Sequence, residues 1–393
     1  MKGKNVEIPE RATIISGIGQ SAIGRRLGRG ALDLTIEAAL QAIRDAGLDR
    51  SEIDGVATGS GYAVAPGASP VLTTDLKEAL RLNLNWYGSA SDSTQMSALI
   101  NACMAVASGQ ARHVLVFRTV TEASSRTLVP GSDAAGRVEG GMQWRAPFGA
   151  PSAANWVGLV ASRYAHEYGM TREQLAWIAL NGRRNATLTP HAVYRTPLTM
   201  EEYISSRMIS SPLCLYDCDV PVDGSMALVV SHIDTARDVN AASIHIEAIS
   251  GPLYQRDTWD QQVDLTRFAA ADAAKRLWSR TDLRPHDVDV AQLYDGFSFL
   301  SLLWLEDMGF CGRGEAAAFV EGGHRIALDG ELPLNTSGGQ LSFGRLHGMG
   351  LLHEACVQLR QLGGERQVLN QPRVALVTNG GGPVASAALL VRR

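Results

Sequence analysis

The chain has 393 residues, 45% of them hydrophobic and 19% charged, so it can bury a large core and is too apolar to be disordered. Its net charge of −4 excludes the overall positive field that is typical of nucleic-acid-binding proteins. No apolar run reaches the length of a membrane span, and the N-terminus lacks the apolar core of a signal peptide, so we expect a soluble cytoplasmic protein with no membrane contact.

The five cysteines are odd in number and scattered along the chain. Cys214 and Cys218 lie close together, but no second pair and no nearby His completes a zinc site. We therefore expect reduced thiols and no metal bound by this chain.

The first part of the chain is expected to alternate strands and helices. Apolar runs at residues 13–17 and around residues 53–61 predict short strands. Residues 32–46 carry apolar side chains at three- and four-residue spacing, which is typical of an amphipathic helix.

A similar order of elements returns late in the chain, at residues 263–296. A helix followed by a strand at residues 93–118 likewise corresponds to residues 349–378. Repetition of this kind predicts two similar α/β halves. We assign them to residues 1–245 and 246–393.

Residues 121–214 interrupt the pattern of the first half. They are richer in Arg, Ser, Pro and aromatic residues, with helices expected at residues 161–169 and 171–186. We interpret this segment as an inserted loop domain.

The C-terminal part holds the segments that are most indicative of a functional site. Residues 332–354 (LPLNTSGGQLSFGRLHGMGLLHE) contain one glycine-rich loop, and Gly380, Gly381 and Gly382 form another. Glycine allows close approach to the backbone and positive φ angles. Tyr294 stands where a strand-like run, VDVAQLYDGF, ends.

In this order and at these spacings, the segments resemble the C-terminal half of a thiolase. The resemblance covers nearly the whole chain and is strongest to the sterol-carrier-protein-linked thiolases and the bacterial lipid-transfer thiolase-like proteins. It rests on the stretches MQWRAPFGAPSAANWV, YISSRMISSPLCLYDCDVPVDG, LYDGFSFLSLLWLEDMGFCGRGE and NTSGGQLSFGRLHG. It implies a thiolase fold of five layers, α-β-α-β-α, with a mixed five-stranded sheet in each half and a loop domain inserted in the first half.

The catalytic residues of a thiolase are missing from the matching positions. The family's nucleophilic Cys falls on Asp92 or Ser93, at the start of the helix near residues 93–109. The His of its Gly-His-Pro motif matches Arg345, and its second catalytic Cys matches Thr378. The resemblance thus keeps the scaffold and not the acyl-transfer chemistry.

Members of the group that lack the nucleophilic Cys resemble steroid side-chain-cleaving aldolases. Those enzymes cleave a β-hydroxyacyl-CoA by a retro-aldol reaction into a ketone and a shorter acyl-CoA. Tyr294 matches the tyrosine that they carry in place of the thiolase His or Asn. Arg345 stands where they carry a second Tyr, whereas the following His347-Gly348 pair is retained.

The chemistry of a retro-aldol reaction fits these residues. The reaction needs a base for the β-hydroxyl proton and donors for the thioester enolate, but no covalent intermediate. Tyr294 can be the base if a neighbouring cation lowers its pKa, and Arg345 is the candidate for that cation. His347 is a second possible base or donor, and the Gly380–Gly382 amides can form an oxyanion hole.

Two other functions remain open. A non-catalytic acyl-CoA-binding or lipid-transfer scaffold subunit would also explain the missing cysteines, and Arg345 better. A thiolase-type acyltransferase would need Asp92 or Ser93 as nucleophile, and no base is evident to activate Ser93.

The resemblance also implies partners. It implies a homodimer with its interface around residues 82–120, and a small zinc-ribbon and OB-fold partner protein that carries the zinc. The CoA thioester enters as the substrate, and no covalently bound cofactor and no nucleic acid are expected.

Overall fold

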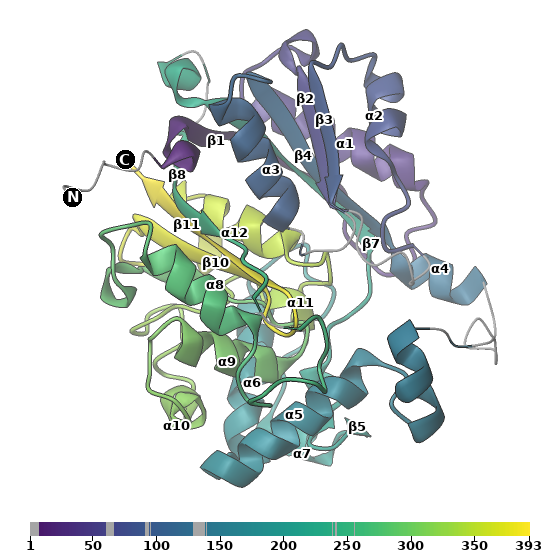
Figure 1. Ribbon diagram of the computed structural model, residues 1–393, viewed down its shortest axis with the longest axis vertical. Coiled ribbons are helices and arrows are strands. Elements are labelled where there is room, and N and C mark those ends of the chain that lie inside the picture. Colours follow the sequence, from purple (N-terminus) through teal and green to yellow (C-terminus); the bar gives the residue numbers. More distant parts are fainter. Residues whose placement is uncertain are drawn as a thin grey trace.

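The computed structural model arranges strands and helices in layers (Figure 1). It describes residues 8–59, 67–90, 94, 96–128, 138, 140–237, 239, 242–254 and 256–393. The strands are β1 (Thr13–Gln20), β2 (Gly55–Gly59), β3 (Trp86–Ala90), β4 (His113–Thr121), β5 (Met208–Ser210), β6 (Leu213–Cys214), β7 (Asp223–His232), β8 (Ile244–Ser250), β9 (Val290–Gln292), β10 (Val374–Gly380) and β11 (Ala385–Arg392). The α-helices are α1 (Ala31–Asp45), α2 (Thr73–Leu80), α3 (Met96–Ala107), α4 (Glu122–Leu128), α5 (Ala153–Tyr168), α6 (Arg172–Thr187), α7 (Met200–Ser205), α8 (Ala269–Trp278), α9 (Ser298–Asp307), α10 (Ala316–Val320), α11 (Gly339–Ser342) and α12 (Met349–Leu359).

The main sheet runs in the order β3-β2-β4-β7-β1-β8-β11-β10-β9. Strands β3, β2 and β4 are parallel, and β7 lies antiparallel between β4 and β1. In the second half β9 and β10 are parallel, and β11 lies antiparallel between β10 and β8. The order β2-β4-β7-β1 therefore repeats as β9-β10-β11-β8, which gives the two similar halves that the sequence predicts.

The two halves differ at one edge. The first half has the five strands expected, whereas among the described residues the second half has four, and the counterpart of β3 beside β9 is a single parallel bridge between Leu334 and Ala291. The fifth strand expected in the second half is thus reduced to this bridge. The halves meet where β1 pairs briefly with β8, through Ile14 and Ile15 opposite His245 and Ile244. Since β8 begins at Ile244, we propose that the second half begins with that strand.

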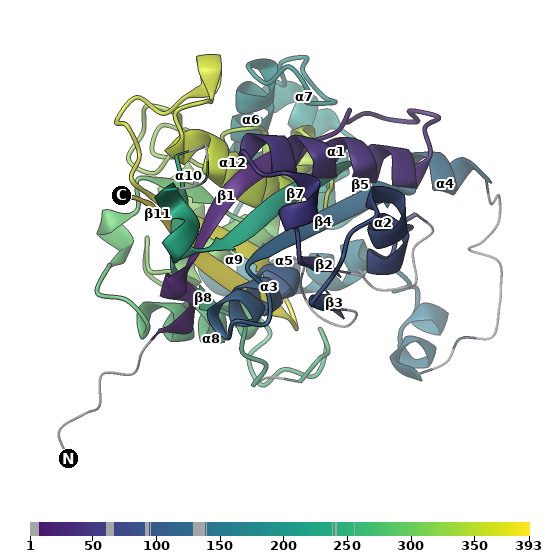
Figure 2. The ribbon, with the colours of Figure 1, turned by 90° about the horizontal axis from the view of Figure 1, so that it is seen from above.

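Helices cover both faces of each half, and two of them lie in the middle. Alternate residues of β4 point to opposite faces: Leu115 and Phe117 pack against α1, whereas Val114 and Val116 pack toward α3. Figure 2 shows α1 and α3 on opposite sides of the first-half strands. One core cluster joins α3 and α12 to strands of both halves, so these helices form the central layer of the five-layered fold.

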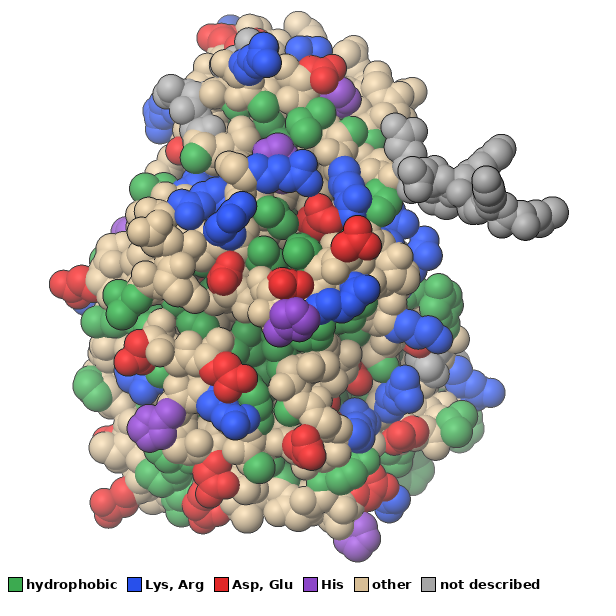
Figure 3. Space-filling view, turned by 90° about the vertical axis from the view of Figure 1, so that its left-hand side faces the viewer, with side chains coloured by type: hydrophobic (Ala, Val, Ile, Leu, Met, Phe, Trp, Pro, Cys, Tyr) green, Lys and Arg blue, Asp and Glu red, His purple; other side chains and the backbone are tan. Residues whose placement is uncertain are grey.

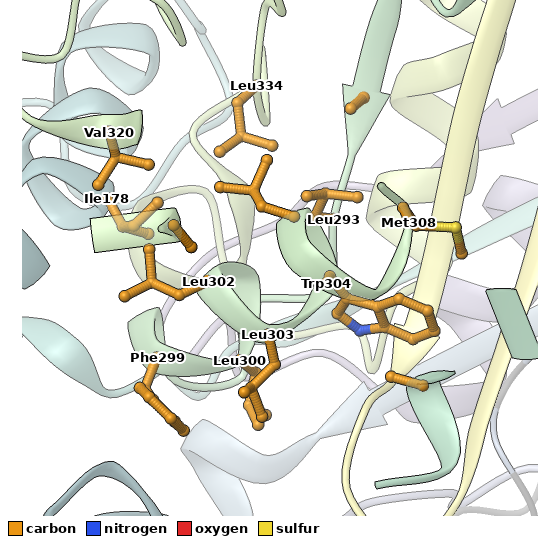
Figure 4. Close-up of a cluster of buried hydrophobic side chains, with 14 of the residues drawn as sticks. Ile178, Leu293, Phe299, Leu300, Leu302, Leu303, Trp304, Met308, Val320 and Leu334 are labelled. Carbon is orange, nitrogen blue, oxygen red and sulfur yellow. The ribbon is translucent and has the colours of Figure 1, made fainter. Parts of the chain in front are cut away.

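The outer face of the second half carries α8 and α9. Helix α9 is apolar all round and is buried along its length, as expected for a helix enclosed on several sides. Figure 4 shows its Leu302 toward Ile178 of α6 and its Trp304 beside Met308. The Trp304 indole also donates to the Gly380 carbonyl oxygen at 3.0 Å, which ties this helix to the glycine loop after β10.

The segment between β4 and β7 contains α4, α5, α6, α7 and the small β5–β6 hairpin, in agreement with the inserted loop domain. Helix α6 packs against α9, α10 and α11 of the second half. On the face drawn in Figure 3, basic and acidic side chains are interspersed. Within the described ranges, no helix is both long enough and apolar enough to cross a membrane.

Candidate active site

Tyr294 is held by its backbone at the end of β9. Its N–H donates to the Thr378 hydroxyl oxygen of β10 at 2.9 Å. The preceding residue, Leu293, is fixed from both sides, because Asn335 accepts from its N–H at 2.8 Å and donates to its carbonyl oxygen at 2.9 Å. Thr378, at the position of the family's second Cys, therefore serves as a support for Tyr294.

The hydroxyl group of Tyr294 lies in a setting that favours its neutral form. Burial raises the pKa of Tyr294, and the negative charge of Asp219 acts in the same direction. The Gln340 amide and the positive charge of Arg118 oppose this shift but do not cancel it. At neutral pH the ligand-free protein therefore holds Tyr294 as a phenol.

Arg345, the cation that the sequence suggests for Tyr294, is bound by two carboxylates. Its guanidinium binds Asp219 at 3.0 Å and Glu122 through a second, short ion pair. The positive charge of Arg118 also acts on Tyr294, in the direction that lowers its pKa. Arg345 also links segments of the site, with its backbone N–H bound to the Val220 carbonyl oxygen at 2.8 Å, and its role as the cation for Tyr294 stays a prediction.

His347 joins this cluster from the start of α12. Its Nε2 lies 2.6 Å from Glu122, and its carbonyl oxygen accepts from the Asn379 amide at 2.8 Å. Burial lowers the pKa of His347 well below its usual value, and the charges of Arg118 and Arg345 act in the same direction. A neutral imidazole that donates from Nε2 to Glu122 leaves the Nδ1 lone pair as an acceptor.

Arg118 and Glu122 are site residues that the sequence did not identify. Val114, Val116 and Val120 of β4 face the central layer, so Arg118, on the same alternation, faces it too. Arg118 is fully buried, and burial lowers its pKa to about 10, which leaves it charged at neutral pH. The sequence signal that could have identified Arg118 is its position as a charged residue inside an otherwise apolar strand.

The nucleophile-equivalent positions, Asp92 and Ser93, lie outside the described residues. The next described residue is Thr94, just before α3, whose hydroxyl bonds that of Ser386. Thr94 also lies against the glycine loop, since a Cβ added to Gly380 would be 3.0 Å from its methyl group. The start of α3 and the loop after β10 are therefore adjacent.

Close packing explains why the loop of Gly380, Gly381 and Gly382 consists of glycine. A Cβ on Gly382 would lie 2.2 Å from the Trp259 ring, and one on Gly381 2.6 Å from the Trp304 indole nitrogen. The Gly381 N–H already donates to the Val384 carbonyl oxygen at 3.0 Å. An oxyanion hole in this loop would have to use the amide of Gly380 or Gly382.

No group of three or more His, Cys, Asp or Glu side chains in the described ranges could hold a metal ion. The residues that the structure brings together are Tyr294, Arg345 and His347, with Arg118 and Glu122 added from β4 and α4. This arrangement combines a phenol, a neutral imidazole and two guanidinium groups at one place.

Comparisons with known proteins agree with this fold and site. A family model described as thiolase C-terminal domain-like matches residues 252–392. A steroid side-chain-cleaving aldolase of Thermomonospora curvata is 34% identical and covers 96% of this chain and 97% of its own length. A 17-hydroxy-3-oxo-4-pregnene-20-carboxyl-CoA lyase of Mycobacterium tuberculosis is 33% identical over 88% of this chain and 91% of its own.

A solved structure, the Ltp2-ChsH2(DUF35) aldolase, superimposes with a TM-score of 0.87 and 32% identity over 98% of this chain and 99% of its own. These matches confirm the predicted thiolase fold and extend over both halves. The chain therefore belongs to the thiolase-like family that contains these aldolases.

Proposed function

We propose that this protein is a carbon–carbon lyase, a thiolase-like aldolase that cleaves a β-hydroxyacyl-CoA by retro-aldol chemistry. The products are a ketone or aldehyde and a shorter acyl-CoA. The observation that carries the proposal is the tyrosine at the site: Tyr294 is held by Thr378, at a position where a thiolase has a catalytic Cys. The names of the two relatives make a steroid acyl chain the first substrate class to test.

In the proposed reaction, the β-hydroxyl group loses its proton to the phenolate of Tyr294. The carbonyl of the ketone forms as the bond between the α- and β-carbons breaks. The electron pair of that bond passes into the thioester as an enolate, which then takes a proton at its α-carbon. No acyl-enzyme forms, so a cysteine nucleophile is not needed.

The direct test is product analysis by mass spectrometry. The chain, purified with and without a partner protein, is incubated with 17-hydroxy-3-oxo-4-pregnene-20-carboxyl-CoA and with a short β-hydroxyacyl-CoA. We expect a ketone or aldehyde and a shorter acyl-CoA without added free CoA. Binding without products would favour the scaffold function, and cleavage of a 3-oxoacyl-CoA only with added CoA would favour the acyltransferase.

We also propose a homodimer formed around residues 82–120. In support, β3 is an end strand of the sheet and its Tyr87 is 66% exposed. Beside it is a hollow of about 560 Å³, lined in part by Trp86 and Met104. Light scattering should give twice the mass of the chain, and a stable monomer at micromolar concentration would contradict the dimer.

A small zinc-ribbon and OB-fold protein is the proposed second partner. The similar solved aldolase is named for two components, Ltp2 and ChsH2(DUF35), which supports a two-chain assembly. Co-expression and pull-down with a candidate small zinc-ribbon and OB-fold protein from the same genome is the test. Cleavage at full rate by the isolated chain would contradict a partner requirement.

A further inference from the structure

Buried hydrogen-bond donors without acceptors gather around Tyr294 and His347. Among the described residues, Nε and Nη2 of Arg118 and Nε of Arg345 have no partner. An unpaired buried polar group loses its hydrogen bonds to water without replacement, so such groups are rare without a reason. All of these unpaired atoms are donors. The cluster therefore lacks an acceptor, which an oxygen atom of a bound ligand would supply.

The geometry of Arg118 makes it the principal donor of this cluster. Its Nη1 is bound on one side by the Gly59 carbonyl oxygen and, at 2.7 Å, by the Ser69 hydroxyl. The unpaired Nε–H and Nη2–H lie on another edge of the planar guanidinium and point in parallel. The contacts of Nη1 fix the plane of the guanidinium. The edge formed by Nε–H and Nη2–H is left for an acceptor on a ligand.

Within the described residues, the charge of Arg118 is also without a carboxylate partner, whereas Arg345 binds both Glu122 and Asp219. A buried cation without a counter-charge costs several kcal/mol, and such groups concentrate at functional sites. Arg118 is therefore poised to receive negative charge that appears only during a reaction.

We propose that Arg118 is a catalytic residue that binds the thioester oxygen of the substrate on its Nε–H and Nη2–H edge. The inference rests on the proposed retro-aldol function and deepens it. When the bond between the α- and β-carbons breaks, its electron pair moves into the thioester, and the oxygen becomes the enolate oxygen. The guanidinium stabilises this charge, a role that the sequence suggested for the glycine loop.

The test separates enolate stabilisation from cleavage. Acetoacetyl-CoA carries an acidic CH₂ between its ketone and thioester, and its enolate has its own ultraviolet absorption band. The intact protein, with its partner if one co-purifies, is titrated with this probe, and the enolate-to-keto ratio of the bound probe is measured. We compare wild type with Arg118→Met and Arg118→Lys. The matched control is Arg280→Lys, since Arg280 is bound to Glu10 outside the site.

We expect wild type and Arg280→Lys to raise the enolate-to-keto ratio above that of the free probe. Arg118→Met should lower the bound ratio about tenfold or more, the value of one charge-assisted hydrogen bond. Arg118→Lys keeps the charge but not the paired N–H groups, so its enolate-to-keto ratio should fall between those of wild type and Arg118→Met. With a cleaved substrate, kcat of Arg118→Met should drop about 10²- to 10³-fold with a smaller change in KM.

An unchanged enolate ratio in Arg118→Met, or no rise in wild type, would overturn the proposal even if the protein cleaves its substrate. If Arg118→Met does not fold, Arg118→Lys decides, and a ratio equal to wild type would overturn the paired-donor role. A ratio that depends on Arg118 in a protein that cleaves no β-hydroxyacyl-CoA would instead support the oxygen site and contradict the retro-aldol function.

Discussion

Strands β4 and β10 occupy equivalent places in the two halves. They carry different residues at the third position that faces the central layer, Arg118 in β4 and Asn379 in β10. Each strand is parallel to one neighbour and antiparallel to the next, and each directs alternate residues into the central layer. The inward positions are Val114, Val116 and Arg118 in β4, and Ala375, Val377 and Asn379 in β10. The amide of Asn379 has an acceptor, the His347 carbonyl oxygen, whereas one edge of Arg118 has none.

This difference indicates that equivalent positions in the two halves of a duplicated fold can have different roles. Asn379 uses its strand-end position to hold the loop before α12 in place. Arg118 uses the equivalent position to present charge to a ligand. The first half thus supplies Arg118 and Glu122, and the second supplies Tyr294 and His347, so the site needs both.

The largest structural effect is expected at the ion cluster that joins the halves. Glu122→Gln removes the charge that binds Arg345 and His347, and it leaves Arg345 with Asp219 alone. Because Glu122 is buried, we expect a loss of about 3 kcal/mol in the free energy of unfolding, measured by urea denaturation.

The matched control is Glu37→Gln. Glu37 pairs with Arg29 on the surface, and such pairs change stability by about 0.5 kcal/mol or less. If Glu122→Gln and Glu37→Gln cost the same, the cluster does not hold the two halves together.

Smaller losses of stability and of kcat are expected when Asn379, near the end of β10, is replaced. Asn379→Ala removes one hydrogen bond to the backbone of His347, so it should cost about 1 kcal/mol of stability. Steady-state kinetics should show a loss of kcat of about tenfold or less, well below the loss for Arg118→Met. An equal loss for the two variants would contradict the different roles assigned to Arg118 and Asn379.

The fold could be predicted because its signals are local and repeated. Helical and strand periodicity, with the same order of elements in both parts, predicted the two similar halves, and the resemblance to thiolases implied their layers. The reduction of the fifth strand beside β9 to a single bridge at Leu334 could not be seen this way, because the family resemblance implied five strands without their lengths.

The site was predicted only in part. Tyr294 stood out because it ends a strand beside glycine-rich motifs. Arg118 and Glu122 did not, because their partners come from distant segments that only the tertiary structure brings to β4. For the same reason Arg345 looked like an available cation, although Glu122 and Asp219 bind it.

The central claim is that Tyr294 is the base of a carbon–carbon cleavage. The most direct test is the pH dependence of kcat/KM for wild type and Tyr294→Phe, with Tyr168→Phe on the outer helix α5 as the control. The phenolate is the active form, and the raised pKa of Tyr294 keeps it scarce at neutral pH. The wild-type rate should therefore rise about tenfold per pH unit between about pH 7 and 9.

Tyr294→Phe, if still folded by circular dichroism, should lose about 10²-fold or more in kcat/KM and show no such rise, while Tyr168→Phe keeps both. A wild-type profile that is flat over this range would indicate His347 as the base, because its lowered pKa leaves it neutral throughout. A Tyr294→Phe variant with the rate and pH profile of wild type would contradict the account.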